Sequence, residues 1–283
     1  MLKLAVQKSG RLKEDSIALL QECGIRIDNR RNQLKVQASN FPLEILFLRN
    51  SDIPGFIENN DVDIGVTGEN LLYEKDPKVK TLFQLGFASC RLAIAVPNAM
   101  KYNSIQDLEG KQIATSYPNS LEKYLTENGV NANISEISGS VEIAPGMGLA
   151  DAVCDLVSSG NTLFTNGLKE VERILKSQAI LISSLTLSDE KKEILEDLLF
   201  RIESVLRSKN KKYILLNCPN EKIQEISNLL PGMRSPSILP LEQEGWSSLH
   251  SVIEESQFWD SINQLRKAGA EGILIIPIEK MIL

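Results

Sequence analysis

One pattern occurs twice in this sequence: an apolar strand, a hydroxyl-bearing residue followed by glycine, and then the start of a helix. The two copies are DIGVTGENLL, from Asp63, and DLVSSGNTLF, from Asp155. Each has an aspartate, a hydroxyl residue four positions later, a glycine, and then a leucine. Chance could produce so short a match. As a duplication, it indicates two similar lobes that present their glycine turns to a shared cleft.

Short strands and helices alternate around both copies, which is typical of the α/β class. In the first series we expect strands over 2–6, 33–38 and 43–48, a helix that stops at Gly24 and a helix entered at Pro54. The second series begins near Arg91. It includes an expected helix over 149–153, after the pair Pro145-Gly146, and a strand opened by Asp155.

The last part of the chain has a different order of elements. A long amphipathic helix is predicted over 189–208, with Ser188 before it and acidic residues in its first turn. The order βαββαβ follows, with its first helix ended by Pro231 and Gly232. This order is typical of a ferredoxin-like unit, and so we place a domain boundary near residue 211.

The overall charge and the cysteines exclude several classes of protein. A net charge of −6 disfavours nonspecific binding to nucleic acid. No apolar run approaches the roughly 20 residues that span a bilayer, and no secretory signal is recognisable at the start. The four cysteines lack CxxC spacing, which favours reduced thiols over disulfides or a zinc site. We therefore expect a cytoplasmic protein that binds neither nucleic acid nor membrane.

The segment SSGNT, residues 158–162, is a candidate phosphate-binding loop. Gly160 allows backbone N–H groups to approach an anion, while Ser158, Ser159 and Thr162 add hydroxyl donors beside Asn161. A hydroxyl-rich helix cap has the same residues, and for SSGNT taken alone the cap is the favoured interpretation.

Two aspartates precede this loop. Asp151 and Asp155 are four residues apart, and carboxylates can accept hydrogen bonds from both hydroxyls of a ribose. A solvated helix end and a turn cap are the alternative interpretation. A phosphate loop together with two acceptors for a diol favours a phosphoribosyl group over a plain phosphate.

A few charged residues elsewhere are weaker candidates. Lys8 and Arg11 flank Gly10 at a strand end and could meet a triphosphate, and Arg91 opens a strand. Glu69 occupies the position of Asn161 in the repeat. The only histidine, His250, is interpreted as a half-buried strand residue, which disfavours catalytic triads and histidine-ligated metal sites.

Several longer motifs are spread over almost the whole length of the chain. They are QKSGRL, IPG, VDIGVTGEN, CRLAIA, IATSYP, GSVEIAPGMGLADAVCDLVSSGNTL, RSPSILPL and IPIEKM. With these motifs the sequence resembles a known family, the long form of ATP phosphoribosyltransferase. The stretch over 142–162 is specific to this family, unlike a lone glycine loop.

The resemblance implies a two-lobed catalytic region like that of periplasmic binding proteins, with a C-terminal ferredoxin-like (ACT-like) regulatory domain. It assigns residues 1–88 and 177–210 to catalytic lobe I, residues 89–176 to lobe II, and residues 211–283 to the regulatory domain.

The implied reaction transfers phosphoribosyl from phosphoribosyl pyrophosphate to N1 of the ATP adenine, the first step of histidine biosynthesis. Mg²⁺ would be carried mainly by the substrate, so no protein metal ligand is assigned. Histidine would inhibit the enzyme, within a homo-oligomer that ranges from dimer to hexamer.

The resemblance also implies roles for particular residues. Asp151 and Asp155 would be catalytic and hold the ribose. Residues 158–162 (Ser158, Ser159, Gly160, Asn161 and Thr162) would bind the phosphoribosyl pyrophosphate. The ATP side would be formed by Lys8, Arg11, Glu69 and Arg91.

Two other classes share the two-lobed pattern. A solute-binding protein has alternating lobes around a ligand cleft, but the missing export signal disfavours it. A ligand-sensing domain of a transcriptional regulator is disfavoured by the acidic charge and by the lack of a helix-turn-helix segment before the first strand.

Overall fold

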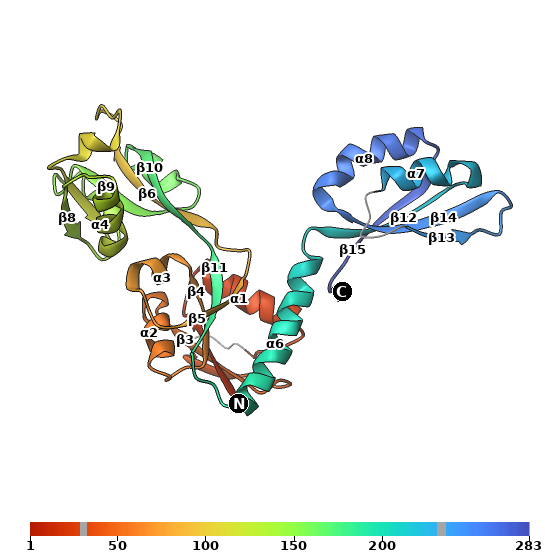
Figure 1. The fold of residues 1–283 in the computed structure, drawn as a ribbon, viewed down its shortest axis with the longest axis horizontal. Coiled ribbons are helices and arrows are strands. Elements are labelled where there is room, and N and C mark those ends of the chain that lie inside the picture. The colour runs from red at the N-terminus through yellow and green to blue at the C-terminus, as the bar shows by residue number, and fades with distance from the viewer. Residues whose placement is uncertain (29–32, 231–235, 283) are drawn as a thin grey trace. The chain divides into compact units, whose positions relative to one another are not determined.

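The computed structural model describes residues 1–28, 33–230 and 236–282. The chain divides into two compact units, Met1–Leu195 and Glu196–Leu283 (Figure 1). Helix α6 (Asp189–Ser208) belongs to both, and its bounds match the predicted ones. No helix within the described ranges has the length and apolar character needed to cross a membrane.

The first lobe is built on a six-stranded sheet in the order β2-β3-β1-β4-β11-β5. Its strands β1, β3 and β4 are parallel, so their carboxyl ends lie at one edge. Apolar residues fill these strands because helices cover them. The strands of this sheet are β1 (Leu2–Gln7), β2 (Lys35–Gln37), β3 (Leu43–Leu48), β4 (Ile64–Gly68), β5 (Lys80–Gln84) and β11 (Ala179–Ser183). The helices are α1 (Arg11–Glu22), η1 (Asn50–Asp52), α2 (Ile53–Glu58) and α3 (Asn70–Lys75).

The second lobe has a five-stranded sheet in the order β10-β6-β9-β7-β8. Strand β9 lies between β6, which is antiparallel to it, and β7, which is parallel to it. The strands are β6 (Cys90–Pro97), β7 (Gln112–Thr115), β8 (Asn133–Glu136), β9 (Ala152–Val157) and β10 (Leu168–Ser177). The helices are η2 (Ile105–Leu108), α4 (Pro118–Glu127), η3 (Val141–Ile143) and α5 (Asn161–Thr165).

The helix expected over 149–153 is wrong. Residues 144–148 form turns after η3, and β9 already begins at Ala152. Two glycines, Gly146 and Gly148, favour turns here, and Gly148 has a φ of +71°. The apolar run after Asp151 is extended because it pairs with β7. The Pro145-Gly146 pair therefore does not introduce a helix, whereas Pro54 lies in the first turn of α2 as expected.

The strand, glycine turn and helix of the sequence repeat occur in both lobes. Strand β4 is followed by α3, and β9 is followed by α5. The chain crosses between the lobes twice, from β5 to β6 and from β10 to β11. The returning strand β11 inserts between β4 and β5, so the first sheet is completed by residues far along the chain (Figure 1).

The terminal unit has the predicted βαββαβ order, with an antiparallel sheet ordered β13-β14-β12-β15. Apolar residues of β12 and β14 pack with α7 and α8 around a separate core. The elements are β12 (Lys211–Pro219), η4 (Asn220–Lys222), α7 (Ile223–Leu229), β13 (Ser237–Pro240), β14 (Trp246–Glu254), α8 (Glu255–Lys267) and β15 (Glu271–Pro277). Pro231 and Gly232, predicted to end the first helix, lie outside the described residues. The predicted fold class is confirmed.

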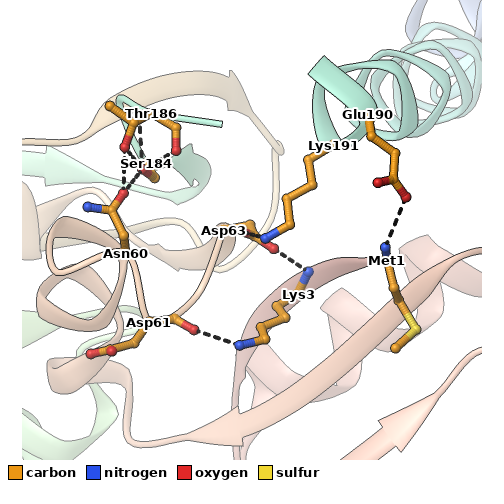
Figure 2. A network of polar contacts seen from close by, with 9 residues as sticks. All are labelled: Met1, Lys3, Asn60, Asp61, Asp63, Ser184, Thr186, Glu190 and Lys191. Atoms are coloured by element: carbon orange, nitrogen blue, oxygen red, sulfur yellow. Dashed lines mark hydrogen bonds and ion pairs between the residues drawn. The ribbon is translucent and has the colours of Figure 1, made fainter. Parts of the chain in front are cut away.

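A polar network attaches the first turn of α6 to the first lobe (Figure 2). The buried carboxylate of Asp63 accepts hydrogen bonds from the backbone N–H of Lys3 and from Lys191 Nζ, each at 2.8 Å. The amino group of Met1 pairs with Glu190 at 3.6 Å. These contacts hold α6 at the amino ends of β1 and β4, opposite the edge where those strands end.

We expect Lys191→Met to lower the free energy of unfolding of the first unit by about 1–3 kcal/mol, because Asp63 stays buried without its cation. Denaturant unfolding measures the change. Lys192→Met is the matched control, since among the described residues Lys192 pairs only with the exposed Asp189, and this substitution should change stability by less than about 0.5 kcal/mol. Equal effects of the two substitutions would contradict a role for the buried pair.

Candidate functional site

A cavity of about 280 Å³ lies where the first helix meets the second lobe. One wall comes from Arg11, the first residue of α1. The other walls come from η3, from the end of β9 and from the loop that follows it. The lining residues are Arg11, Glu142, Asp155, Leu156, Val157, Ser158, Ser159, Gly160, Thr162 and Leu163. Most of the residues proposed from sequence for a phosphate loop therefore line one cavity.

The loop over 158–162 follows β9, and its last two residues, Asn161 and Thr162, begin the short helix α5. Gly160 has a φ of +85°, a left-handed conformation that L side chains rarely adopt. The side chains of Ser158, Ser159 and Thr162 are exposed. Within the described part of the chain, the hydroxyls of Ser158 and Thr162 have no protein partner. The loop therefore presents free hydroxyl donors to the cavity, as a phosphate-binding loop requires.

Arg91 holds this loop in place. Its Nη1 donates to the Ser158 carbonyl at 2.9 Å, while Nε donates to Glu170 at 2.7 Å and Nη2 pairs with it at 2.5 Å. The bond from Arg91 lowers the pKa of the Glu170 carboxyl. The sequence placed Arg91 on the ATP side, but its guanidinium is occupied by Glu170 and the loop backbone. The pairing with a residue 79 positions away could not be foreseen from the sequence.

Asp155 lies within β9, opposite Ala93 of β6, and does not open the strand as expected. One carboxylate oxygen accepts a hydrogen bond from the Leu156 N–H at 2.8 Å. Burial raises the pKa of Asp155, and the negative charge of Glu142 adds to the rise. Two carboxylates thus share the cavity. Sequence reasoning missed Glu142 as a site residue, although Glu142 begins the family-specific stretch over 142–162.

Asp151 lies at the opposite end of β9 from the loop. The six residues of β9 separate Asp151 from Ser158, which corresponds to roughly 20 Å in an extended strand. Its carboxylate accepts a hydrogen bond from the Gln112 N–H at 2.9 Å. It lines a different hollow, together with Pro145 and Leu149. The structure does not bring Asp151 to the loop, because the expected helix is replaced by a strand.

Three cations lie at the carboxyl edge of the first sheet. Lys8 follows β1 and Arg49 follows β3, and the Lys8 N–H donates to the Leu48 carbonyl at 2.8 Å. Arg11 begins α1 a few residues later. Among the described residues, Lys8, Arg11 and Arg49 have no ion-pair partner. Sequence reasoning missed Arg49, although it follows an apolar strand as Lys8 does.

Glu69 lies at the same edge, just before α3. Its backbone N–H donates to the carbonyl of Gln178 at 2.9 Å, and its side chain is partly exposed. The roles of Lys8, Arg11 and Glu69 toward ATP stay predictions.

Neither a metal cluster nor a histidine centre is found in the part of the chain that the structure describes. Over 1–28, 33–230 and 236–282, no group of three or more His, Cys, Asp or Glu side chains could hold a metal ion. His250 lies partly buried in β14 of the terminal unit, as predicted. Its ring nitrogens contact the Tyr213 hydroxyl at 2.6 Å and the Ser248 hydroxyl at 3.1 Å.

Comparison with known proteins identifies the family. The model described as ATP phosphoribosyltransferase matches residues 49–204, and that of the HisG C-terminal domain matches residues 208–280. The chain belongs to the ATP phosphoribosyltransferase family. Members from Cytophaga hutchinsonii and Phocaeicola vulgatus are 55% and 52% identical over 282 and 283 residues. These alignments cover 100% of this chain and 99% and 100% of the relatives.

A solved chain of the ATP phosphoribosyl transferase (HisG:HisZ) complex from Thermotoga maritima is 27% identical, with a TM-score of 0.62. The match covers 71% of this chain and 96% of that chain. The family resemblance read from the motifs is therefore confirmed.

We expect Arg91→Lys to weaken binding of ribose 5-phosphate about tenfold, which corresponds to about 1.4 kcal/mol. A lysine can pair with Glu170, but it lacks the planar fork that also reaches the Ser158 carbonyl. Titration calorimetry measures the affinity. Arg173→Lys is the control, because Arg173 contacts Glu170 at 3.4 Å from an exposed position. Unchanged affinity in Arg91→Lys would show that the loop does not depend on this contact.

Proposed function

We propose that this chain is an ATP phosphoribosyltransferase. It transfers the phosphoribosyl group of phosphoribosyl pyrophosphate to N1 of the ATP adenine and releases diphosphate, the first step of histidine biosynthesis. One observation carries the proposal: the hydroxyl loop over 158–162 and the carboxylates of Asp155 and Glu142 line one cavity with Arg11. Phosphate donors next to diol acceptors suit a phosphorylated ribose.

Each lobe takes one part of the reaction. On the second lobe, the loop over 158–162 binds the 5-phosphate, and Asp155 with Glu142 accepts hydrogen bonds from the ribose hydroxyls. On the first lobe, the cations Lys8, Arg11 and Arg49 face the phosphates of ATP and the departing diphosphate, with Glu69 beside them. Asp151 and Arg91 are left out, because one lies at the far end of β9 and the other holds the loop.

The chemistry needs little proton transfer from the protein. The adenine nitrogen has a lone pair and attacks carbon 1 of the ribose directly, while the bond from carbon 1 to the diphosphate oxygen breaks. Positive charge develops on the sugar ring, and the carboxylate of Asp155 stabilises it. The cations of the first lobe stabilise the diphosphate as it leaves. Positioning and electrostatic stabilisation therefore supply most of the rate.

In this proposal magnesium would be carried mainly by the substrate phosphoribosyl pyrophosphate. Asp155 and Glu142 offer the carboxylate oxygens that this ion prefers, and they are only two, which suits an ion held mainly by the substrate. When bound, magnesium neutralises charge on the departing diphosphate.

The terminal unit is proposed to bind histidine and to slow the enzyme. Its separate core and separate family match support an independent ligand-binding domain. The homo-oligomer expected from the family, from dimer to hexamer, is part of the same proposal. Because the reaction consumes ATP, we place the protein in the cytoplasm, where ATP is abundant.

The purified chain should form phosphoribosyl-ATP from ATP, phosphoribosyl pyrophosphate and magnesium, and added histidine should suppress the reaction. Ultraviolet absorbance follows product formation, with pyrophosphatase present to remove diphosphate. Formation of product that histidine does not affect would leave the catalytic proposal intact and overturn the regulatory one. Absence of product from folded protein would overturn the catalytic proposal.

The pH dependence of turnover tests the role of Asp155. Its pKa is raised by burial and by Glu142, so activity that needs the ionised carboxylate is lost as the pH falls through this raised value. Glu142→Gln removes a neighbouring negative charge, which should lower the pKa of Asp155 and move the acid limb of kcat/KM to lower pH.

Glu136→Gln is the control, since Glu136 lies exposed at the end of β8 and should leave the limb in place. Asp155→Asn should lower kcat by about 100-fold or more and remove the limb. An acid limb at the same pH in Glu142→Gln and in the unaltered chain would show that another group titrates.

A further inference from the structure

Helices α3 and α4 meet across the two lobes through one buried carboxylate. Glu74 lies near the end of α3 in the first lobe, and its carboxylate accepts hydrogen bonds from the first turn of α4 in the second lobe. The donors are the backbone N–H groups of Asn119, at 3.0 Å, and Ser120, at 2.9 Å. The Ser120 hydroxyl adds a third bond at 2.7 Å. In return, Asn119 Nδ2 donates to the Glu74 carbonyl at 2.8 Å.

The carboxylate depends on these donors. Glu74 is 8% exposed, and the described residues provide it with no cation. A buried charge without a cation is retained only when hydrogen bonds satisfy it, and bonds to a carboxylate are among the stronger ones in proteins. The backbone N–H groups in the first turn of α4 have no partner within the helix, as at every helix start, and can therefore donate to Glu74. The two helices are therefore fixed to each other by directional bonds rather than by apolar contact alone.

On the second lobe, this contact leads to Asp155 in three steps. Asn119 and Ser120 follow Tyr117 at the start of α4, and the Tyr117 N–H donates to Thr115 Oγ1 at 2.9 Å. The Thr115 hydroxyl donates in turn to the Cys154 carbonyl in β9, at 2.7 Å. Cys154 is next to Asp155 in that strand.

The pKa of Tyr117 fits this arrangement. Burial raises it, and the negative charge of Asp155, followed by smaller contributions that include Glu74, raises it further. The charges of both carboxylates therefore act on Tyr117, at the start of α4.

On the first lobe, the contact leads to the ATP side. Helix α3 begins at Asn70, directly after Glu69 at the carboxyl end of β4. The Asn70 N–H donates to the hydroxyl of Ser177 at 3.0 Å. Ser177 ends β10, just before the chain crosses to β11 of the first lobe. The helix that carries Glu74 is thus fixed at its start, directly after Glu69 of the proposed ATP side.

We propose that Glu74 is a positioning residue that sets the spacing between the ATP side of the first lobe and the ribose side of the second. This inference rests on the proposed function. It goes beyond that function because Glu74 touches no reacting atom and lines no part of the cavity. Its effect is on the distance between two bound substrates, and a misplacement of about 1 Å at a reacting centre can cost about 100-fold in rate.

The test is Glu74→Gln in the full chain, assayed with both substrates. Glutamine keeps the size of the side chain but removes the charge and directs an amide N–H at the donors of α4. We expect kcat to fall 10-fold to 100-fold, while the Kd of each substrate measured alone changes less than about threefold, because each lobe still binds its own substrate. Ser120→Ala, which removes one of the bonds, should lower kcat about threefold to tenfold with the same unchanged affinities.

Glu122→Gln is the matched control, since Glu122 lies on the exposed face of the same helix and should leave kcat unchanged. If Glu74→Gln does not fold, Ser120→Ala carries the test alone. A folded Glu74→Gln with kcat within about twofold of the unaltered chain would overturn the proposal. Loss of affinity for one substrate in proportion to kcat would also overturn it.

Hydrogen exchange separates this inference from the proposed function. In Glu74→Gln the amides of Asn119 and Ser120 should exchange at least tenfold faster, and those of the β9 residues next to Asp155 should also exchange faster. If the unaltered chain forms no product, the proposed function fails, and the exchange rates still report whether Glu74 holds the second lobe. Unchanged exchange in both segments would overturn the positioning role.

Discussion

The position of β9 between two neighbouring strands determines most of the site. Hydrogen bonds to β6 on one side and β7 on the other fix this strand, and its carboxyl end carries the loop over 158–162. Asp155 lies near the carboxyl end of β9, opposite Ala93 of β6, and lines the cavity there. Arg91 of β6 reaches the loop because it pairs with Val157, the last residue of β9. A loop with free hydroxyls would lose its shape without such support. The residues proposed to bind phosphate can therefore stay exposed while the backbone beneath them is held firmly.

The site also separates its charges between the lobes. Three cations lie with the carboxylate of Glu69 at the edge of the first sheet, and Asp155 and Glu142 lie in the cavity wall formed by the second. This separation suits a reaction in which negative charge leaves one side of a ribose while positive charge develops on the ring. Many two-lobed proteins bind a ligand between lobes, so the fold alone left a solute-binding protein and a sensor domain as alternatives. Family membership resolves that choice.

The sequence alone predicted the helices, the strands and the position of the loop better than it predicted the contacts between distant side chains. The alternation of apolar strands and helices was sufficient for the two lobes, and α6 agrees with its predicted bounds because its periodicity and acidic first turn are local features. The helix expected over 149–153 failed because pairing with β7 overrides local propensity, and this moved Asp151 away from the loop. The partnership of Arg91 with Glu170 and the bridge from Glu74 to α4 join residues far apart in the chain. No spacing in the sequence indicates such pairs.

The chain passes between the lobes twice, and Glu74 adds a third attachment away from those crossings. With two attachments alone, the lobes can still rotate relative to each other about the line through the two crossings. A third attachment off that line removes the rotation. The two lobes then keep a fixed separation. Substrates must enter between the lobes at that separation, or the Glu74 contacts must break each time that the lobes move apart.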